Sequence, residues 1–343
     1  MFKCAIVGVS GGRARGHAQA YEHVERGQLA CISTRNEENL NAFGDEFGVA
    51  ARYTDYREMF ELERPDLVHV NTPPDVRLEI MMAAEYAGVP ALIVEKPLAI
   101  QGEDYAAIRG YCGMGRCKVA INHQLHFHPR RAALQKLVLD GGIGPLRFID
   151  ASARMNLAYQ GTHSLQAIGA FNPAKPVSVF GQVAGAKGLE ESPRKHFAPD
   201  QSMAAIAYEN GVNAVLRCGK NAPAVGGREK VNESKRIAVY GERGYVAWSM
   251  WDWETFIDGA HEGGEHDYRA EDVLGQAAMT EAMFDWLLDD DKLHPLNLDL
   301  ALQDFEVILA MYVSALRHRV VDLPFEPEPD LIESLRAALA PTA

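Results

Sequence analysis

A glycine-rich turn near the start of the chain has the residue types that bind phosphate. Gly8, Gly11 and Ala14 follow an apolar run at residues 4–7 and precede a helical pattern that begins at about residue 16. Glycines at such a turn let the backbone approach a pyrophosphate, and the helix N-terminus then donates N–H groups to it. The spacing carries one residue more than GxGxxG, and glycines also occur in other turns between a strand and a helix. The position directly after an N-terminal strand favours a dinucleotide site with contacts from Gly8, Ser10, Gly11, Gly12, Arg13 and Ala14.

The end of the second apolar run, at residues 29–33, bears on which dinucleotide binds. An NAD site usually has an acidic residue here that holds the ribose hydroxyls, but this chain has Thr34 and Arg35. A hydroxyl and a guanidinium form charge-assisted hydrogen bonds with a 2′-phosphate, which a carboxylate would repel. Arg13, Arg15 and Arg35 form an expected basic patch for that phosphate. We therefore predict NADP as the preferred cofactor, with NAD as the other; alternatively, Arg35 is a solvated residue at a helix start.

Alternating strand and helix patterns predict how this turn is held in place. Strands are expected at residues 4–7, 29–33, 67–71, 91–94 and 118–122, and helices at 16–26, 37–47, 76–87 and 105–111. Such alternation is typical of an α/β fold with a doubly wound parallel sheet. We assign residues 1–122 to a dinucleotide-binding Rossmann domain.

The pattern changes near residue 145, where strand-like runs follow one another. Strands are expected at 146–154, 177–183, 202–208, 212–218, 236–240 and 245–248, with helices at 271–288 and 300–319. Two hairpin turns, at 209–211 and 241–244, predict an antiparallel sheet. Residues 219–228, which are rich in Gly, Ala and Pro, predict a mobile loop. We assign 123–343 to a substrate-binding and oligomerisation domain.

Length, charge and cysteine content exclude several classes of protein. The chain has 343 residues, more than the roughly 250–300 that one core usually supports, so two domains are expected. Its formal net charge of −13 disfavours nucleic acid and anionic membranes as partners. Five cysteines without a CxxC pair argue against a disulfide scaffold and favour a reducing compartment. Since no apolar run reaches about 18 residues, we expect a cytoplasmic protein without a membrane span.

A charged segment at the end of the strand expected at 91–94 makes a family resemblance specific. Glu95-Lys96-Pro97 lies where open α/β sheets bind ligands, at the carboxyl end of a parallel strand. Together with the glycine-rich turn and the segment Asn71-Thr72-Pro73, it resembles the Gfo/Idh/MocA family of NAD(P)-dependent oxidoreductases. The similarity continues through Gly161-Thr162-His163 to the helix expected at 300–319, and so covers nearly the whole chain.

The resemblance implies both an architecture and an activity. Members combine a Rossmann domain with an α/β domain whose open sheet is mostly antiparallel and often serves self-association, here as a dimer or tetramer. They typically exchange a hydride between nicotinamide and a secondary hydroxyl or ketone of a sugar, inositol or related polyol. By resemblance, Lys96 contacts the substrate and the nicotinamide ribose, Pro97 shapes the junction, and Glu95 supports it. The cofactor contacts implied beyond the glycine-rich turn are Asn71, Thr72, Pro73, Glu95, Lys96 and Pro97.

The segment around His163 is expected to complete the chemistry. A histidine with a near-neutral pKa is a suitable base for a hydroxyl proton, although a packed histidine at a helix start is the alternative. Lys96 would stabilise the negative charge that develops on the same oxygen. Members commonly carry aspartates where this chain has Tyr159 and Gln166, so the substrate or the catalysis is expected to differ from the inositol pattern. The expected substrate contacts are Lys96, His126, Tyr159, Gln160 and His163.

Two other interpretations remain open on the sequence. One is an NAD-dependent glycosidase of the same fold, and the other is a cofactor-binding protein with impaired catalysis, suggested by the missing aspartate. Three histidines at 123, 126 and 128 resemble a zinc-binding cluster, but the resemblance assigns this segment to the cofactor and substrate cleft. We expect no bound metal.

Overall fold

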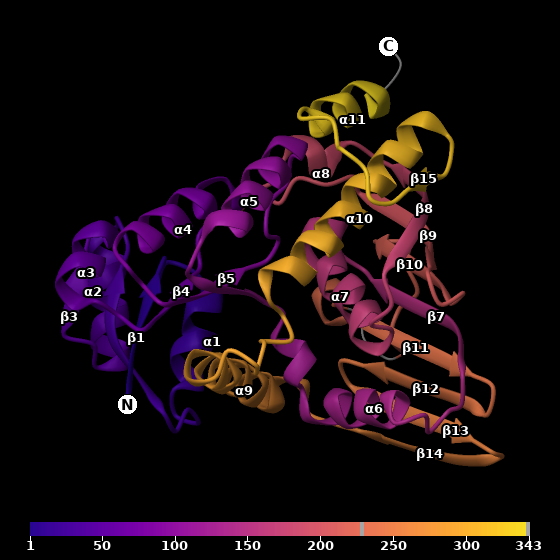
Figure 1. Ribbon diagram of the computed structural model, residues 1–343, viewed down its shortest axis with the longest axis horizontal. Coiled ribbons are helices and arrows are strands. Elements are labelled where there is room, and N and C mark those ends of the chain that lie inside the picture. The colour runs from indigo at the N-terminus through magenta and orange to yellow at the C-terminus, as the bar shows by residue number, and fades with distance from the viewer. Residues whose placement is uncertain (227–229, 341–343) are drawn as a thin grey trace. The chain divides into compact units, whose positions relative to one another are not determined.

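The computed structural model describes residues 1–226 and 230–340, so part of the loop predicted at 219–228 lies outside the described residues. The chain forms two compact units that interleave along the sequence (Figure 1). The first unit comprises Met1–Leu98, Ala107–Phe127 and Arg269–Ala301, and the second comprises Ala99–Ala106, His128–Tyr268 and Leu302–Ala343. Each unit contains its own sheet.

The sheet of the first unit is parallel throughout, with the strand order β3-β2-β1-β4-β5-β6. This order reverses between β1 and β4, as in the doubly wound dinucleotide-binding fold. The predicted fold class is therefore confirmed. Its strands are β1 (Phe2–Val7), β2 (Gly27–Ser33), β3 (Ala51–Tyr53), β4 (Leu67–Val70), β5 (Ala91–Glu95) and β6 (Lys118–Asn122).

Helices cover both faces of this sheet, and Figure 1 shows α4 on one side and α1 with α9 on the other. Their boundaries are α1 (Gly12–Ala20), α2 (Glu37–Phe47), α3 (Tyr56–Glu63), α4 (Arg77–Tyr86), α5 (Gly102–Met114) and α9 (Tyr268–Leu288). The boundaries of α2 are those predicted. The Asn36 side chain accepts the Asn39 N–H at its start, and Gly48, with φ of +67°, ends it. The helix α1 begins at Gly12, four residues before the expected start at residue 16, without a side-chain cap to mark it.

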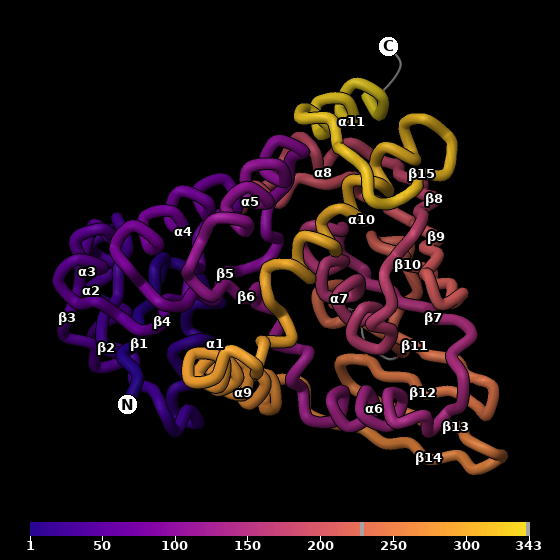
Figure 2. The backbone as a smooth tube through the Cα atoms, viewed as in Figure 1, coloured from indigo at the N-terminus to yellow at the C-terminus, as the bar shows by residue number. Residues whose placement is uncertain are grey.

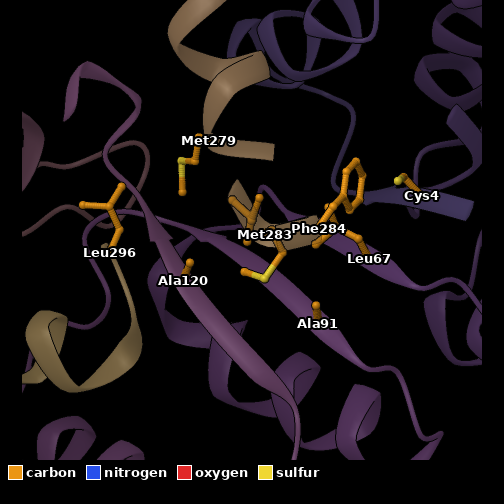
Figure 3. Packing of buried hydrophobic residues seen from close by; sticks show 9 residues of the cluster. Cys4, Leu67, Ala91, Ala120, Met279, Met283, Phe284 and Leu296 are labelled. Carbon is orange, nitrogen blue, oxygen red and sulfur yellow. The ribbon is translucent and has the colours of Figure 1, made fainter. Parts of the chain in front are cut away.

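A late segment of the chain completes the hydrophobic core of the first unit. Met279, Met283 and Phe284 of α9 pack against Cys4 and other fully buried side chains of the parallel sheet (Figure 3). The Phe284 ring also stacks on Phe2, with centroids 4.4 Å apart. The remaining members of this cluster are Leu67, Ala91, Ile93, Ala120 and Leu296. The dinucleotide-binding sheet therefore depends on residues from far along the sequence.

The second unit has a nine-stranded sheet in the order β14-β13-β12-β11-β7-β10-β9-β8-β15. Neighbouring strands are antiparallel except β7 and β10, which are parallel, so the expectation of an antiparallel sheet holds for most of it. Figure 2 shows β11 to β14 following one another across it. The strands are β7 (Leu146–Ala153), β8 (Pro176–Ala184), β9 (Gln201–Tyr208), β10 (Asn213–Gly219), β11 (Lys235–Gly241), β12 (Gly244–Ser249), β13 (Asp252–Ile257), β14 (Ala260–Glu265) and β15 (Val321–Asp322).

One face of this second sheet is covered by helices. The helix α7 (Thr162–Phe171) packs on β7 and β11, and α6 (Pro129–Leu139) packs on β12. The helix α10 (Leu298–Arg317) reaches β8, where the Gly181 N–H donates to Ser314 Oγ at 2.9 Å. The opposite face exposes large apolar side chains, namely Phe148, Phe180, Met203, Tyr240 and Phe256. None of the helices within residues 1–226 and 230–340 has both the length and the apolarity needed to cross a bilayer.

The packing of α9 predicts that truncating Phe284 weakens the first unit. We expect Phe284→Ala to lower the free energy of unfolding by about 3–5 kcal/mol, because it removes a buried aromatic ring and leaves a cavity. Leu288→Ala on the same helix is the matched control, since Leu288 is 68% exposed. Urea denaturation followed by fluorescence measures both. A loss below about 1 kcal/mol for Phe284→Ala would show that α9 does not support the sheet.

Candidate functional site

A pocket of about 450 Å³ lies in the first unit, beside the strand ends where the sheet order reverses. It is lined by the turn after β1, the ends of β2 and β4, and residues at the starts of α3 and α4. Among the predicted cofactor residues, it brings together Gly8, Ser10, Gly11, Thr34, Arg35, Asn71, Thr72 and Pro73. Ligands of open α/β sheets bind at this position.

Gly8 has a conformation and surroundings that other residues would not tolerate. Its φ is +90°, and a Cβ there would lie 2.9 Å from the carbonyl oxygen of Asn71. Gly11 and Gly12, in contrast, have no heavy atoms within 4 Å of an added Cβ. The turn is therefore tight at Gly8 and open at the following glycines, where a ligand can approach the backbone.

The N-terminus of α1 offers donors for an anion. Gly11 is its N-cap without a side-chain cap, and the first turn contains no acidic residue. The Asn71 amide atoms and Thr72 Oγ1, which belong to the same pocket, are buried without hydrogen-bond partners among the described residues. Because buried polar groups are rarely left unpaired, these atoms are suited to a polar ligand. The donors and acceptors present fit the pyrophosphate and ribose of a dinucleotide.

The far end of the pocket carries the residues expected to select the cofactor. Ser10 Oγ lies 3.3 Å from Thr34 Oγ1, and both side chains line the pocket. Arg35 is exposed there and forms no ion pair with the described residues. Arg57 also lines this end, but its guanidinium donates to Glu79. Arg35 is thus the cation available for a phosphate group.

The expected basic patch is smaller than the sequence suggested. Arg15 pairs with Glu46 at 2.9 Å, and Arg13 pairs with Asp272 at 3.0 Å. Neither arginine lines the pocket, so of the three only Arg35 does. The reason is that acidic partners distant in sequence engage the other two guanidinium groups.

Glu95 has a buried carboxylate that joins three elements of the first unit. It ends β5 and is 8% exposed. Its Oε1 lies 3.2 Å from His17 Nε2 and 3.3 Å from Arg13 Nε, both on α1, and accepts from Asn122 Nδ2 on β6. Arg13 also donates to Gln276 on α9. The Glu95 carboxylate thus fixes α1 against the sheet, and through Arg13 it also fixes α9.

The titration of these groups follows from their burial. Burial alone would raise the pKa of Glu95, but the hydrogen bond from His17 and the positive charge of Arg13 outweigh it and lower that pKa. Burial lowers the pKa of His17, although Glu95 opposes the shift. Burial also lowers the pKa of His69, whose ring lies 4.6 Å from His17 and 2.8 Å from the Tyr21 hydroxyl. The cluster therefore holds an ionised carboxylate and favours neutral histidines.

Arg77 is a buried residue of this site that the sequence did not single out. It is 2% exposed and donates from Nε to the Thr72 carbonyl at 3.0 Å and from NH1 to the Pro97 carbonyl. It therefore ties the pocket segment after β4 to the segment that contains Lys96, which is half-buried. Burial lowers the pKa of Arg77 to about 10, so it remains a cation at neutral pH. Arg77 is the first residue of α4, and this position in the sequence does not indicate that its side chain is buried or what it binds.

His163 belongs to the second unit, in the first turn of α7, and is 6% exposed. A π-helical turn at Leu157–Gly161 precedes it and is capped by Asn156, which accepts the Tyr159 N–H at 3.0 Å. The Tyr159 ring lies 4.6 Å from the ring of His196, and Gln160 accepts from Lys235 Nζ. Tyr159, Gln160 and His163 therefore follow one another on a single continuous helical segment.

The remaining predicted residue, His126, lies in the first unit within a 3₁₀ turn, Gln124–Phe127, and its ring is 5.0 Å from Phe127. Gln124 of the same turn donates to Asp272 at 2.8 Å. In the part of the chain that the structure describes, no three His, Cys, Asp or Glu side chains group as metal ligands.

The strand order and the pocket define the first unit as a Rossmann-type dinucleotide-binding module. Residues 2–123 match the family model described as an oxidoreductase family with an NAD-binding Rossmann fold. The match over residues 2–123 agrees with the resemblance to the Gfo/Idh/MocA family.

Two relatives and one solved structure extend the comparison. D-apiose dehydrogenase from Paraburkholderia graminis is 27% identical over 42% of this chain and 38% of its own length. D-xylose 1-dehydrogenase (NADP(+)) 2 from Haloferax volcanii is 28% identical over 35% of each chain. This chain therefore spans little more than a third of the relatives it matches. The crystal structure of aldose-aldose oxidoreductase from Caulobacter crescentus, complexed with glycerol, has a TM-score of 0.79 at 21% identity, over 94% of this chain and 99% of that one. It shows that the fold is shared.

The buried histidines predict a dependence of stability on pH. The pKa values of His17 and His69 are lowered in the folded state, so the unfolded chain binds more protons below pH 6.5, the ordinary histidine value. The free energy of unfolding should therefore fall as pH drops from 7 to 5, by up to about 1.4 kcal/mol per pH unit for each histidine. Urea unfolding across this range measures the slope.

His69→Gln separates this cause from general acid effects. It retains a partner for the Tyr21 hydroxyl but does not titrate, so the slope should fall by about 1 kcal/mol per pH unit. His318→Gln, at an exposed position, is the control. Equal slopes in wild type and His69→Gln would contradict this account of the cluster.

Proposed function

We propose that this protein is an oxidoreductase that transfers a hydride between a nicotinamide dinucleotide and a secondary hydroxyl or ketone of a sugar or related polyol. The observation that carries the proposal is the pocket beside α1, with its uncapped helix N-terminus and the unpartnered polar atoms of Asn71 and Thr72. The sugar dehydrogenases named above support the substrate class. Residues 1–122 would serve the cofactor, and 123–343 would serve the substrate and self-association.

NADP is the proposed preferred cofactor, with NAD as the alternative. Thr34 and Arg35 would hold the 2′-phosphate at the far end of the pocket, while Gly8, Ser10, Gly11 and Gly12 would leave room for the pyrophosphate. The name of the Haloferax relative, which specifies NADP(+), agrees with this choice. The bound nicotinamide would supply the hydride acceptor or donor. The buried ion cluster keeps the N-terminal turn of α1 in place for the phosphates.

Lys96 and His163 are the proposed catalytic residues. When a hydroxyl carbon loses its hydride and the oxygen loses its proton, negative charge develops on the oxygen. The Lys96 ammonium would stabilise that charge, and His163 would take the proton. Arg77 fixes the carbonyl of Pro97, next to Lys96, and so acts as a positioning residue. Tyr159, Gln160 and His126 are the proposed substrate contacts.

Two alternatives would give different products. An NAD-dependent glycosidase would release a sugar without net reduction of the cofactor. A catalytically impaired protein would bind the cofactor but turn over no substrate. Tyr159 stands where the resemblance implies an aspartate, and this supports the second alternative.

The open face of the second sheet is the proposed surface for self-association into a dimer or tetramer. Its exposed apolar side chains, such as Phe148 and Phe256, form a surface of a kind that monomers rarely leave in water. All five cysteines are free thiols, which agrees with the expected reducing compartment. A cytoplasmic location stays a prediction.

Cofactor preference is tested by Arg35→Asp. Loss of a charge-assisted hydrogen bond and repulsion by the new carboxylate should raise the Kd for NADP by about 10- to 100-fold. The Kd for NAD should change by less than about threefold, since NAD lacks the 2′-phosphate. Arg15→Asp, outside the pocket, is the matched control. Isothermal titration measures each Kd, and equal NADP affinity in wild type and Arg35→Asp would refute the assignment.

Catalysis is tested by Lys96→Ala and His163→Ala, assayed at nicotinamide absorbance with a panel of sugars and inositols. We expect kcat to fall by about 10²- to 10³-fold for Lys96→Ala and 10²- to 10⁴-fold for His163→Ala. His163→Ala should bind NADP as wild type does, because His163 belongs to the second unit. His318→Ala is the control. Near-normal rates in either variant would remove that residue from the mechanism.

A further inference from the structure

Two glutamines on the His163 segment each accept a hydrogen bond from a buried cation. Gln160 lies three residues before His163 and accepts from Lys235 Nζ. Gln166 lies three residues after it and accepts from Arg131 NH2 at 3.0 Å. Lys235 is 5% exposed and Arg131 is 1% exposed. Because residues three apart in a helix are neighbours, both cations lie close to the helical turn that carries His163.

The guanidinium group of Arg131 is the one on which the argument depends. Its guanidinium forms no ion pair with any residue the structure describes, and its Nε has no hydrogen-bond partner there. The Trp248 ring, 5.9 Å from Cζ, offers only a weak cation–π contact. Burial lowers the pKa of Arg131 to about 9, so it is still charged at pH 7. A buried charge without a counter-ion is costly and is therefore rarely kept.

The elements that pack most extensively on α7 supply no free carboxylate. They are α6, β7, β10, β11 and the turn Leu157–Gly161, and the acidic residue among them is Asp150 on β7. Its carboxylate oxygens pair with Arg217 at 2.5 Å and Arg236 at 2.8 Å. Asp150 alternates with Ile149, so it shares the open face of the sheet with Phe148, away from α7.

The loop near Tyr159 also contains the carboxylate of Asp200. Asp200 accepts the backbone N–H groups of Gly188 at 2.8 Å and Lys187 at 3.2 Å, and so serves that loop. Among the described residues, Arg131 therefore keeps a positive charge beside α7 without a counter-ion, although the whole chain carries a net charge of −13. In a low-dielectric interior, such a charge acts over several ångströms.

We propose that the substrate of the second unit is an acidic sugar of the uronate type, one that carries a carboxylate. The proposal rests on the proposed function and names its substrate class. The substrate carboxylate would supply the negative charge that the neighbourhood of Arg131 lacks. The amide oxygens of Gln160 and Gln166 accept from the two cations and so hold them beside the helical turn that carries His163.

The test compares sugars that differ only in the acid group, with the full chain and NADP or NAD. D-Glucuronate is paired with D-glucose, and D-galacturonate with D-galactose. Titration calorimetry on the cofactor-loaded protein measures binding, and nicotinamide absorbance measures kcat/KM. The acid of at least one pair should bind and react at least tenfold better than its neutral partner. Neutral sugars that bind equally well or better would overturn the proposal.

Gln166→Glu tests whether the charge of Arg131 causes the preference for acids, since it places a carboxylate against Arg131 with little change in shape. We expect the acid-to-neutral binding ratio to fall about tenfold, chiefly through weaker acid binding. Leu139→Glu adds the same charge at a 51% exposed position of α6 and should leave the ratio unchanged. An unchanged ratio in folded Gln166→Glu would contradict the proposal. If that variant fails to fold, the wild-type ratios decide alone.

These outcomes separate the proposal from the function on which it rests. Neutral sugars oxidised without a preference for acids would refute the acidic substrate and leave the oxidoreductase intact. Acid binding without reduction of either cofactor would refute the oxidoreductase and leave the anion site intact. Failure of both acids to bind would overturn the substrate class whatever the activity.

Discussion

The first unit depends on the interactions that the buried Glu95 carboxylate makes with α1. This carboxylate lies at the carboxyl end of β5, and its ion pair with Arg13 and contact with His17 hold α1. Through Arg13, the same charge connects to Asp272 on α9. Leaving one member of a buried ion pair unpaired typically costs about 3–5 kcal/mol, so these groups must be kept together. The Glu95 carboxylate therefore orients α1, the end of β5 before Lys96 and, through Arg13, α9.

Each unit keeps one arginine without an acidic partner among the described residues. In the first unit, the pocket has the uncapped N-terminus of α1 and Arg35, which forms no ion pair with the residues that the structure describes, while Arg13 and Arg15 are paired with acidic partners. In the second unit, Arg131 is buried and has no acidic partner in the described parts of the chain. An acidic chain can thus present positive charge at chosen places, because net charge describes solubility and long-range steering rather than any one site.

Sequence reasoning located most strands because apolar runs, turns and caps are local signals. The boundaries of α2 were predicted because Asn36 and Gly48 mark them. Residues 51–53 and 252–265 were not predicted as strands. The first segment is only three residues long, and the second ends in β14, which is exposed throughout and has no apolar alternation. The start of α1 was placed too late because it has no side-chain cap.

The candidate site divides in the same way. The sequence placed Gly8, Asn71 and Glu95 correctly at the ends of β1, β4 and β5, since their position relative to the strands is a local property. The partners of Arg13, and the burial of Arg77 and His69, depend on contacts between residues far apart in sequence. No spacing rule reports such contacts, so the basic patch was predicted too large and the Arg77 tie was missed. The substrate contacts of the second unit likewise depend on how loops that are far apart in sequence are placed in the fold.

Transfer of a deuterium label would test hydride transfer most directly. The protein is incubated with NADPH carrying two deuterium atoms at C4 of the nicotinamide and with a panel of keto sugars and keto sugar acids, and the products are examined by mass spectrometry. We expect a reduced product that carries one deuterium on the new hydroxyl carbon, with an equal amount of NADP formed. Cofactor that binds but leaves no deuterium in any product would contradict it.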